Sequence, residues 1–219
     1  MQGKSNYLQN KLDDFLYRAQ AFAPASPLYV GLLVAGGGIR AASTAYTLNQ
    51  LVVVQNSTAN GGDGLYHLYL VTTAGTTAAT QPTTYTGAVG EAITDGTAVL
   101  TEQTTNLKAV GSSFVEASGG AYARVSVASS LANWSGTQGA GTTAVSSGTT
   151  GQISNNNAIT FPTSSAAWAA SPAVVWATFT ADALTAGNVY HIGSLTSPVS
   201  VGSGVTPSLA AGSLSVTEL

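Results

Sequence analysis

Glu116-Ala-Ser-Gly-Gly-Ala-Tyr-Ala-Arg-Val-Ser-Val127 is the stretch around which the other segments of the chain are arranged. Its adjacent glycines can adopt the positive φ angles of a tight turn, and polar and apolar residues alternate after them. The pattern predicts a strand at 121–128 with two faces: Tyr122, Arg124 and Ser126 on the polar face, and Ala123, Val125 and Val127 on the apolar face.

The chain carries few charges for its length. Its 219 residues allow one large domain or two small ones, and only 7% of them are charged, against about 25% in an average soluble domain. Six Lys plus Arg leave a net charge of −3 and no basic stripe, so we expect no nucleic-acid partner. No run of about 18 apolar residues occurs, so we expect no insertion into a membrane. The polar first residues lack the apolar core of a signal peptide, which predicts a protein that stays in the cytoplasm unless the cell lyses.

Residues that carry catalysis or bind metals are scarce and scattered. The chain has no cysteine, and its two histidines, His67 and His191, lack a further ligand at metal-binding spacing. No glycine-rich nucleotide-binding motif and no nucleophile elbow occurs. Glu91, Asp95 and Glu102 could gather around a calcium ion, although turn and edge-strand positions explain them more simply. We therefore predict no catalytic residue, no metal ligand and no cofactor.

A helix is predicted at 5–18, with Ser5 as its N-terminal cap. Four apolar residues recur at helical spacing on one face: Leu8, Leu12, Phe15 and Leu16. This stripe fits a helix that packs on its own domain, or one that docks on a neighbouring subunit. For docking, the candidate interface residues are Leu8, Leu12 and Phe15. Two prolines in the following segment, 22–27, predict a rigid extended connector.

After the connector the pattern changes to short strands. Residues 28–34 form a continuous apolar run, which predicts a central strand. Turn-forming residues separate further predicted strands at 51–54, 65–71, 92–93, 98–100, 121–128, 153–161, 173–180, 188–195 and 214–217. A segment rich in Gly, Thr and Ser at 135–151 predicts an exposed loop. Many short strands with almost no helix predict an antiparallel β-sandwich.

Three tryptophans differ in their surroundings. Trp176 lies within an apolar strand and is expected in the core. Trp134 and Trp168 lie at loop edges, where a large ring fits either the core or a subunit interface.

Six motifs lie along the chain in the order found in a known family: Lys4-Ser5-Asn6-Tyr7-Leu8 with Asn10-Lys11-Leu12, Leu28-Tyr29-Val30-Gly31-Leu32, Glu116-x-Ser118-Gly119-Gly120-x-Tyr122-Ala123-Arg124, Ile159-x-Phe161-Pro162-Thr163, Gly193-x-Leu195-Thr196-x-Pro198, and Ala210-Ala211-Gly212-x-Leu214-x-Val216. Together they resemble small bacteriophage virion proteins commonly named tail fibre proteins. Family members run from the first strand through a short glycine-rich stretch to the Ser-Gly-Gly segment, whereas residues 39–111 intervene here. We predict a jelly-roll-type β-sandwich formed by 1–38 plus 112–219, with a small all-β module inserted at 39–111.

The inserted segment carries motifs of its own: Ala45-Tyr46-x-Leu48-x-x-Leu51-Val52-Val53, Tyr69-x-Val71-Thr72-Thr73-Ala74-Gly75-Thr76, Pro82, and Val89-Gly90-x-Ala92-x-Thr94-Asp95-Gly96-Thr97. This set is similar to a small β-module of phage virion proteins, which in turn resembles short carbohydrate-binding modules of chitinase type. The Trp that such modules often place after the proline and near the last strand is absent, and Thr83, Thr84 and Leu100 stand at or near those places. Four tyrosines are therefore the candidate glycan contacts: Tyr46, Tyr66, Tyr69 and Tyr85.

The resemblance implies a virion component, and the scarcity of charge and of cofactor motifs agrees with it. We predict a homo-oligomer, a trimer, that binds capsid, neck or tail proteins and displays the inserted module. Either the N-terminal helix or the strand with Tyr122 and Arg124 is expected to face a partner chain. The alternative is a receptor-binding fibre whose inserted module contacts a glycan of the host surface. Assembly is expected in the cytoplasm of the bacterial host.

Overall fold

The computed structural model describes residues 2–4, 6–35, 37–62, 64, 66–88, 90–103, 114–169, 173–181 and 189–217. This part of the chain is β-structure with one α-helix and a single 3-10 turn. Its elements, in chain order, are β1 (Gln2–Lys4), α1 (Asn6–Arg18), β2 (Leu28–Ala35), β3 (Ala45–Tyr46), β4 (Leu51–Gln55), η1 (Thr58–Asn60), β5 (Tyr66–Thr73), β6 (Gly75–Thr76), β7 (Ala92–Asp95), β8 (Ala98–Glu102), β9 (Phe114–Glu116), β10 (Val125–Val127), β11 (Gln152–Ser154), β12 (Ile159–Thr160), β13 (Ala173–Phe179), β14 (Val189–Val199), β15 (Ser208–Leu209) and β16 (Ser215–Thr217).

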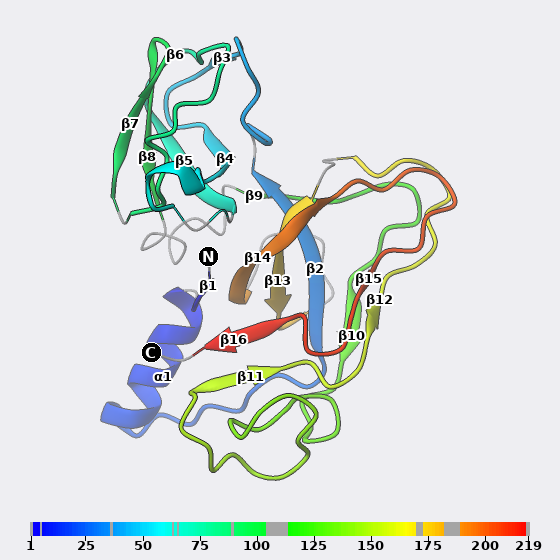
Figure 1. The fold of residues 1–219 in the computed structure, drawn as a ribbon. Coiled ribbons are helices and arrows are strands. Elements are labelled where there is room, and N and C mark those ends of the chain that lie inside the picture. The colour runs from blue at the N-terminus through cyan, green and yellow to red at the C-terminus, as the bar shows by residue number, and fades with distance from the viewer. Residues whose placement is uncertain are drawn as a thin grey trace.

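A six-stranded antiparallel sheet forms the centre of the fold (Figure 1). Its order is β1-β14-β13-β2-β10, and β9 pairs with another part of β2. The prediction that residues 28–34 form a central strand is confirmed, because β2 pairs with β13 on one side and with β10 and β9 on the other. The apolar sequence of β2 follows from this position: Val30 and Leu32 are buried on one face and Leu33 on the opposite face.

Two short strand pairs, β11 with β16 and β12 with β15, cover the first face of this sheet. The core between the layers draws on both of them: Val30, Leu32, Trp176 and Leu195 from the six-stranded sheet, and Ile159, Phe161, Leu214 and Val216 from the second layer. Trp168 also belongs to this core, and Trp134 packs against it. The predicted all-β sandwich is therefore confirmed.

A second sheet lies in the segment predicted to be inserted. It has four antiparallel strands in the order β4-β5-β8-β7, with the pair β3 and β6 beside it. The β7–β8 hairpin turns where the sequence predicts, because Asp95 pairs with Ala98 and Gly96 has a φ of 66°. Tyr69 and Tyr85 meet edge to face in the core of this sheet, with ring centroids 5.0 Å apart.

The second face of the six-stranded sheet packs against the four-stranded one. One apolar cluster contains residues of both: Leu33, Val175, Ala177, Phe179, Val189 and Ile192 from the first, and Leu51, Val53 and Leu68 from the second. The intervening chain also pairs with β4 in parallel, since Arg40 N–H donates to the Val53 carbonyl at 2.8 Å and Val53 N–H to the Gly38 carbonyl at 2.9 Å. The division into 1–38 plus 112–219 and 39–111 stays a prediction, and its boundary at 111 lies outside the described residues.

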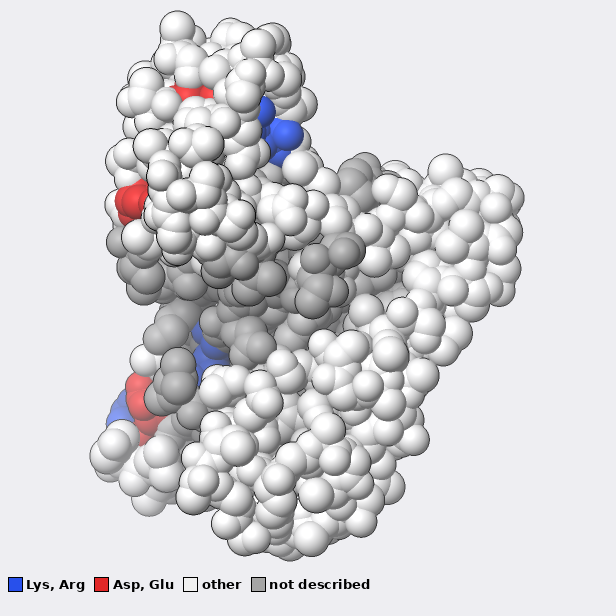
Figure 2. All heavy atoms as spheres, in the orientation of Figure 1, with Lys and Arg blue, Asp and Glu red and all other residues white. Residues whose placement is uncertain are grey.

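Helix α1 is predicted correctly over 6–18, whereas the Ser5 cap lies outside the described residues. Leu8 is buried, and the ring of Tyr7 stacks on Tyr190 of β14 with centroids 6.0 Å apart. Within the described chain, no helix has the length and apolar character needed to cross a membrane. Figure 2 shows a face that is almost entirely uncharged, as the composition leads one to expect.

The strand predicted at 121–128 is shorter than expected, since β10 covers only Val125–Val127. The preceding turn is as predicted, and φ is positive at all three residues of 119–121. The predicted alternation of faces is wrong, because Tyr122 and Arg124 are buried. The sequence pattern places polar side chains at the surface, because it does not reveal which partners inside the fold could bury them. Tyr122 and Arg124 both have such partners.

The strand predicted at 153–161 is in fact two strands, β11 and β12, interrupted at 155–158. Asn155 is buried at this break, and its side chain holds the surrounding backbone segments together. Its amide donates to the carbonyls of Asn157 and Ala210, and its oxygen accepts from the Leu214 N–H at 2.9 Å. Residues 135–151 contain no helix or strand, as predicted.

Candidate functional site

Glu116, Tyr122 and Arg124 meet in a buried polar cluster, because the turn at 118–121 folds the chain back towards the end of β9. Arg124 donates from Nε to Oε1 of Glu116 at 2.8 Å and from Nη2 to Oε2 at 2.7 Å. The Tyr122 hydroxyl donates to the same Oε1 at 2.8 Å and accepts from the Leu32 N–H at 3.0 Å. Burial, and then the charge of Glu116, raise the pKa of Tyr122, so its hydroxyl stays protonated.

The Arg124 guanidinium is also held by contacts beyond the carboxylate. Its central carbon lies 3.5 Å from the centroid of the Phe179 ring, and Nη1 donates to the Ala181 carbonyl at 2.7 Å. Gly31 leaves room for the cluster, since a Cβ there would lie 2.7 Å from Oε1 of Glu116. The cluster therefore braces β9, the turn and the end of β13 against β2.

The prediction that Tyr122 and Arg124 face a partner chain does not agree with the structure. They are only 8% and 6% exposed, and their polar atoms bond within the chain. Arg124 is buried within its own chain because Glu116 of the same chain gives its guanidinium a bidentate carboxylate partner.

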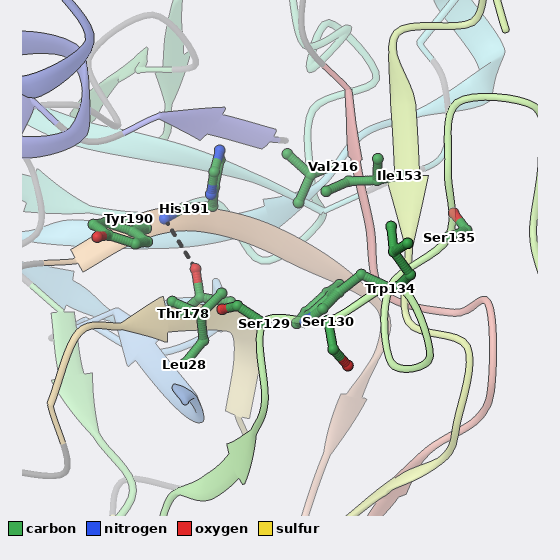
Figure 3. Close-up of a pocket in the computed structure, with 11 residues that line it drawn as sticks. Leu28, Ser129, Ser130, Trp134, Ser135, Ile153, Thr178, Tyr190, His191 and Val216 are labelled. Carbon is green, nitrogen blue, oxygen red and sulfur yellow. Dashed lines mark hydrogen bonds between the residues drawn. The ribbon is translucent and has the colours of Figure 1, made fainter. Parts of the chain in front are cut away.

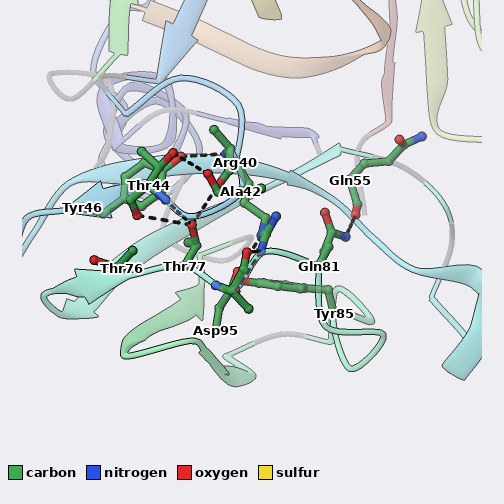
Figure 4. Close-up of polar contacts among 12 residues, drawn as sticks. Arg40, Ala42, Thr44, Tyr46, Gln55, Thr76, Thr77, Gln81, Tyr85 and Asp95 are labelled. Carbon is green, nitrogen blue, oxygen red and sulfur yellow. Dashed lines mark hydrogen bonds and ion pairs between the residues drawn. The ribbon is translucent and has the colours of Figure 1, made fainter.

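The four-stranded sheet has a comparable brace around Asp95 (Figure 4). Arg40 donates from Nε to Oδ2 at 2.6 Å and from Nη2 to Oδ1 at 2.9 Å. The Tyr85 hydroxyl donates to Oδ2 at 3.0 Å and the Ala78 N–H to Oδ1 at 2.8 Å. Burial acts to raise the pKa of Asp95, but the bonds from Arg40, Ala78 and Tyr85 outweigh it and hold that pKa below its ordinary value.

Near the Asp95 cluster, the carboxylate of Glu91 accepts hydrogen bonds from residues four and five positions before it. Its carboxylate accepts from the Thr86 hydroxyl at 2.5 Å, from the Gly87 N–H at 2.7 Å and from the Tyr69 hydroxyl. Burial acts to raise the pKa of Glu91, but these bonds lower it overall. Each oxygen therefore has donors from the protein itself.

The calcium alternative has no support in the structure. Glu91 and Asp95 accept hydrogen bonds from different groups, and Glu102 lies 3.3 Å from Nδ1 of His67. Among the described residues, no group of three or more acid or histidine side chains is placed to hold a metal ion. The acids of this sheet thus act as acceptors in its own core.

The four candidate glycan tyrosines do not form a platform. Tyr46 is buried with its hydroxyl accepting from the Ala41 N–H at 2.9 Å, and Tyr69 and Tyr85 are fully buried. A ring can stack on a sugar only through an open face, so these three do not suit that role. Tyr66 is half-buried and packs against the cluster shared by the two sheets. Aromatic side chains commonly fill the core of a small domain, and this explains why three of the four candidate tyrosines are buried.

A pocket of about 430 Å³ opens where the six-stranded sheet meets β11 and β16 (Figure 3). Its walls are mainly apolar and aromatic side chains: Leu28, Leu131, Trp134, Ile153, Tyr190 and Val216. Three serines, one threonine and His191 complete the described lining, and none of these described residues is Asp, Glu, Lys or Arg. The indole N–H of Trp134 is buried and has no acceptor in the described part of the chain. Sequence reasoning missed this pocket and marked only Trp134, as a residue of the core or of an interface.

Helix α1 begins beside this pocket and then leaves the body of the protein. Tyr190, a pocket residue, stacks on Tyr7 in the first turn of the helix. Leu8 is buried and Leu12 half-buried, but Phe15 is 51% and Leu16 65% exposed. The predicted stripe therefore packs on its own chain at one end and is open to solvent at the other. The assignment of Leu8, Leu12 and Phe15 to a subunit interface stays a prediction.

A comparison with protein families gives a match over residues 63–217 to the family described as Podophage GP4 fiber I protein gp80. The matched region covers more than half of the chain. It includes most of the four-stranded sheet, the Ser-Gly-Gly turn and all strands of the sandwich except β1 and β2, and it crosses the predicted boundary at 111. No curated protein matches the chain. The resemblance to chitinase-type carbohydrate-binding modules stays a prediction.

Proposed function

This chain belongs to the podophage GP4 fiber I protein gp80 family, and on that premise we propose that it is a fibre subunit that assembles with copies of itself on the phage particle. Membership makes it a phage fibre-type virion protein, in agreement with the resemblance seen in the sequence. The proposal adds three points: self-association through α1, three copies per assembly, and display of the segment 39–111.

The observation that carries the proposal is the exposed end of the α1 stripe. Phe15 and Leu16 continue the face on which Leu8 is buried, yet more than half of each is open to solvent. Large apolar residues gathered at one exposed place commonly mark a contact with another protein. A protein surface with few charges is also less prone to nonspecific association when copies cover one another.

The connections of residues 36–113 support the display of this segment. Its chain leaves β2 after Ala35 and returns at Phe114, and these two residues pair with each other across β2 and β9. A segment that leaves and re-enters at adjacent positions can be accommodated without altering the sheet that carries it. Because the four-stranded sheet also packs on the sandwich, we expect it to be held in a fixed orientation on the particle.

Receptor binding through the tyrosines of the module has less support than assembly. Three of its four candidate rings are buried, so this alternative would need another surface of the module. We find no observation that favours an enzymatic role, and Asp95, Glu102 and His67 of the module are buried.

The test of the proposed function has two measurements. Mass spectrometry of purified particles should detect the chain in stoichiometric amount, and light scattering of the purified protein should give one defined oligomer. The double variant Phe15→Ser/Leu16→Ser should reduce that oligomer to monomer, whereas Tyr17→Ser, at an exposed position on the other side of the helix, should not. Absence from the particle, or an oligomer that survives the double variant, would contradict the proposal.

A further inference from the structure

We propose that the pocket beside β14 receives the exposed end of α1 from a second copy of the chain. This inference rests on the proposed self-assembly and names the surface that accepts the helix. The contact is heterologous: each copy would insert its own Phe15 and Leu16 into one neighbour and receive the same residues from another.

The two surfaces are matched in chemical character. The described lining of the pocket is mainly apolar and aromatic, with four Ser or Thr residues and His191, and no acid, lysine or arginine is among these described residues. The end of α1 offers Leu12, Phe15 and Leu16. Two of its charges, Arg18 and Asp14, neutralise each other at 2.7 Å, and Lys11 and Asp13 of the same helix are exposed and opposite in sign. Neither surface therefore favours a charged partner such as a nucleic acid or an acidic peptide.

Hydrogen bonding adds a second match. The last turn of an α-helix carries carbonyl oxygens that lack partners within the helix. Trp134 lines the pocket, and its indole N–H is buried without an acceptor in the described chain; such a group favours any arrangement that supplies one. An incoming helix end brings apolar side chains and carbonyl acceptors together.

A helix cannot fill the pocket of its own chain. Its first turn is fixed beside the rim by the stacking of Tyr7 on Tyr190 and by the burial of Leu8. No residue of α1 lines the pocket, and Phe15 and Leu16 are exposed. The helix end and the pocket are thus both unoccupied by the same chain, which is the condition for a head-to-tail contact.

Ring closure strengthens such an association. One helix end covers less than the roughly 800 Å² per partner of a standard interface, so a single junction is expected to be weak. In a closed ring every copy makes two junctions, and the second forms within the assembly at high effective concentration. A closed ring therefore predicts monomer and full oligomer, with little of the intermediate sizes.

The first test compares single charged substitutions on the two surfaces. Leu16→Glu alters the helix, and Leu131→Glu alters the pocket rim at a residue that is 50% exposed. Each should raise the concentration for half-assembly by about tenfold or more. The matched controls, Tyr17→Glu and Val145→Glu, place the same charge at exposed residues outside both surfaces and should change it little. An oligomer unaffected by Leu131→Glu would overturn the inference and leave the proposed self-assembly standing, whereas a monomeric wild type would overturn both.

The second test uses the absence of cysteine from the chain. Leu16→Cys and Leu131→Cys chains are mixed and oxidised, and the disulfide between them is detected by mass spectrometry. Cross-linking should be at least several-fold more efficient than in the control mixture of Leu16→Cys with Val145→Cys. Equal yields in the two mixtures, or efficient linkage of Leu16→Cys to itself, would show that helices do not enter pockets and would overturn the inference.

Discussion

Arg124 and Glu116 are joined by two hydrogen bonds of 2.8 and 2.7 Å, with both side chains inside the fold. Such a bidentate pair has a fixed geometry, and its partners lie on opposite sides of the Ser-Gly-Gly turn. The Glu116–Arg124 pair therefore acts inside the fold, where it holds the Ser-Gly-Gly turn closed.

Glu116→Gln should destabilise the protein strongly. The substitution leaves the guanidinium of Arg124 buried without its counter-charge, and breaking one side of a buried pair costs about 3–5 kcal/mol. Urea unfolding followed by tryptophan fluorescence gives the free energy. The control is Asp14→Asn, which breaks the exposed pair with Arg18 and should cost at most about 0.5 kcal/mol. Similar losses for the two variants would contradict the assigned role of Glu116.

Gly120→Ala should cost more stability than Gly119→Ala, although the glycines are adjacent and both have positive φ. At Gly120 a Cβ would lie 2.2 Å from the Ala166 carbonyl oxygen, while at Gly119 nothing lies within 4 Å. Gly119→Ala should therefore show only the strain of an alanine in the left-handed conformation, a loss of about 1–2 kcal/mol. Gly120→Ala adds a clash with backbone and should exceed it clearly in the same unfolding experiment. Equal losses would mean that the turn adjusts and that close packing at Ala166 is not required.

The parts of the fold that the sequence predicts are those with a strong local signal. The continuous apolar run of β2 and the Asp95–Gly96 hairpin both lie where predicted, and the Leu8 stripe predicts α1. Strands of two or three residues, such as β1, β3 and β15, were missed because pairing with distant residues, and no local pattern, defines them.

The site was harder to predict, and the errors share one cause. The alternating pattern places Tyr122 and Arg124 on a polar face, and the resemblance to carbohydrate-binding modules proposes Tyr85 as a glycan contact, but each side chain has an acid of its own chain as its partner. The acid lies six to ten residues away in the sequence, so the partner becomes apparent only when the turn between them is known. The pocket was missed for a related reason, since its walls come from residues 28, 131, 153, 190 and 216 of the chain.

Acid should weaken the four-stranded sheet through Asp95 and Glu91. The pKa of each is lower in the folded protein than its ordinary value, so the unfolded chain binds more protons as the pH falls. Their contribution to stability is full above the ordinary values of about 3.9 and 4.3, and it is lost as the pH falls through those values towards the folded-state pKa. Unfolding free energies measured from about pH 3 to 7 should decline at the acid end. Asp95→Asn should lower stability at neutral pH and reduce the acid-dependent decline, and an unchanged decline would show that other groups cause it.

Tyr85→Phe should lower the stability of the protein and leave any binding of sugar unchanged. The substitution keeps the ring in the core but removes the hydroxyl that donates to Asp95, and a hydrogen bond to a charged group contributes about 1.5–3 kcal/mol. Tyr66→Ala is the matched comparison, because Tyr66 is the one member of the four candidate tyrosines that is half-buried. If the full-length protein binds a glycan in an array, a tyrosine contact predicts that Tyr66→Ala weakens the binding while Tyr85→Phe does not. A glycan signal lost in Tyr85→Phe at unchanged stability would show instead that the Tyr85 hydroxyl reaches a ligand, contrary to its burial against Asp95.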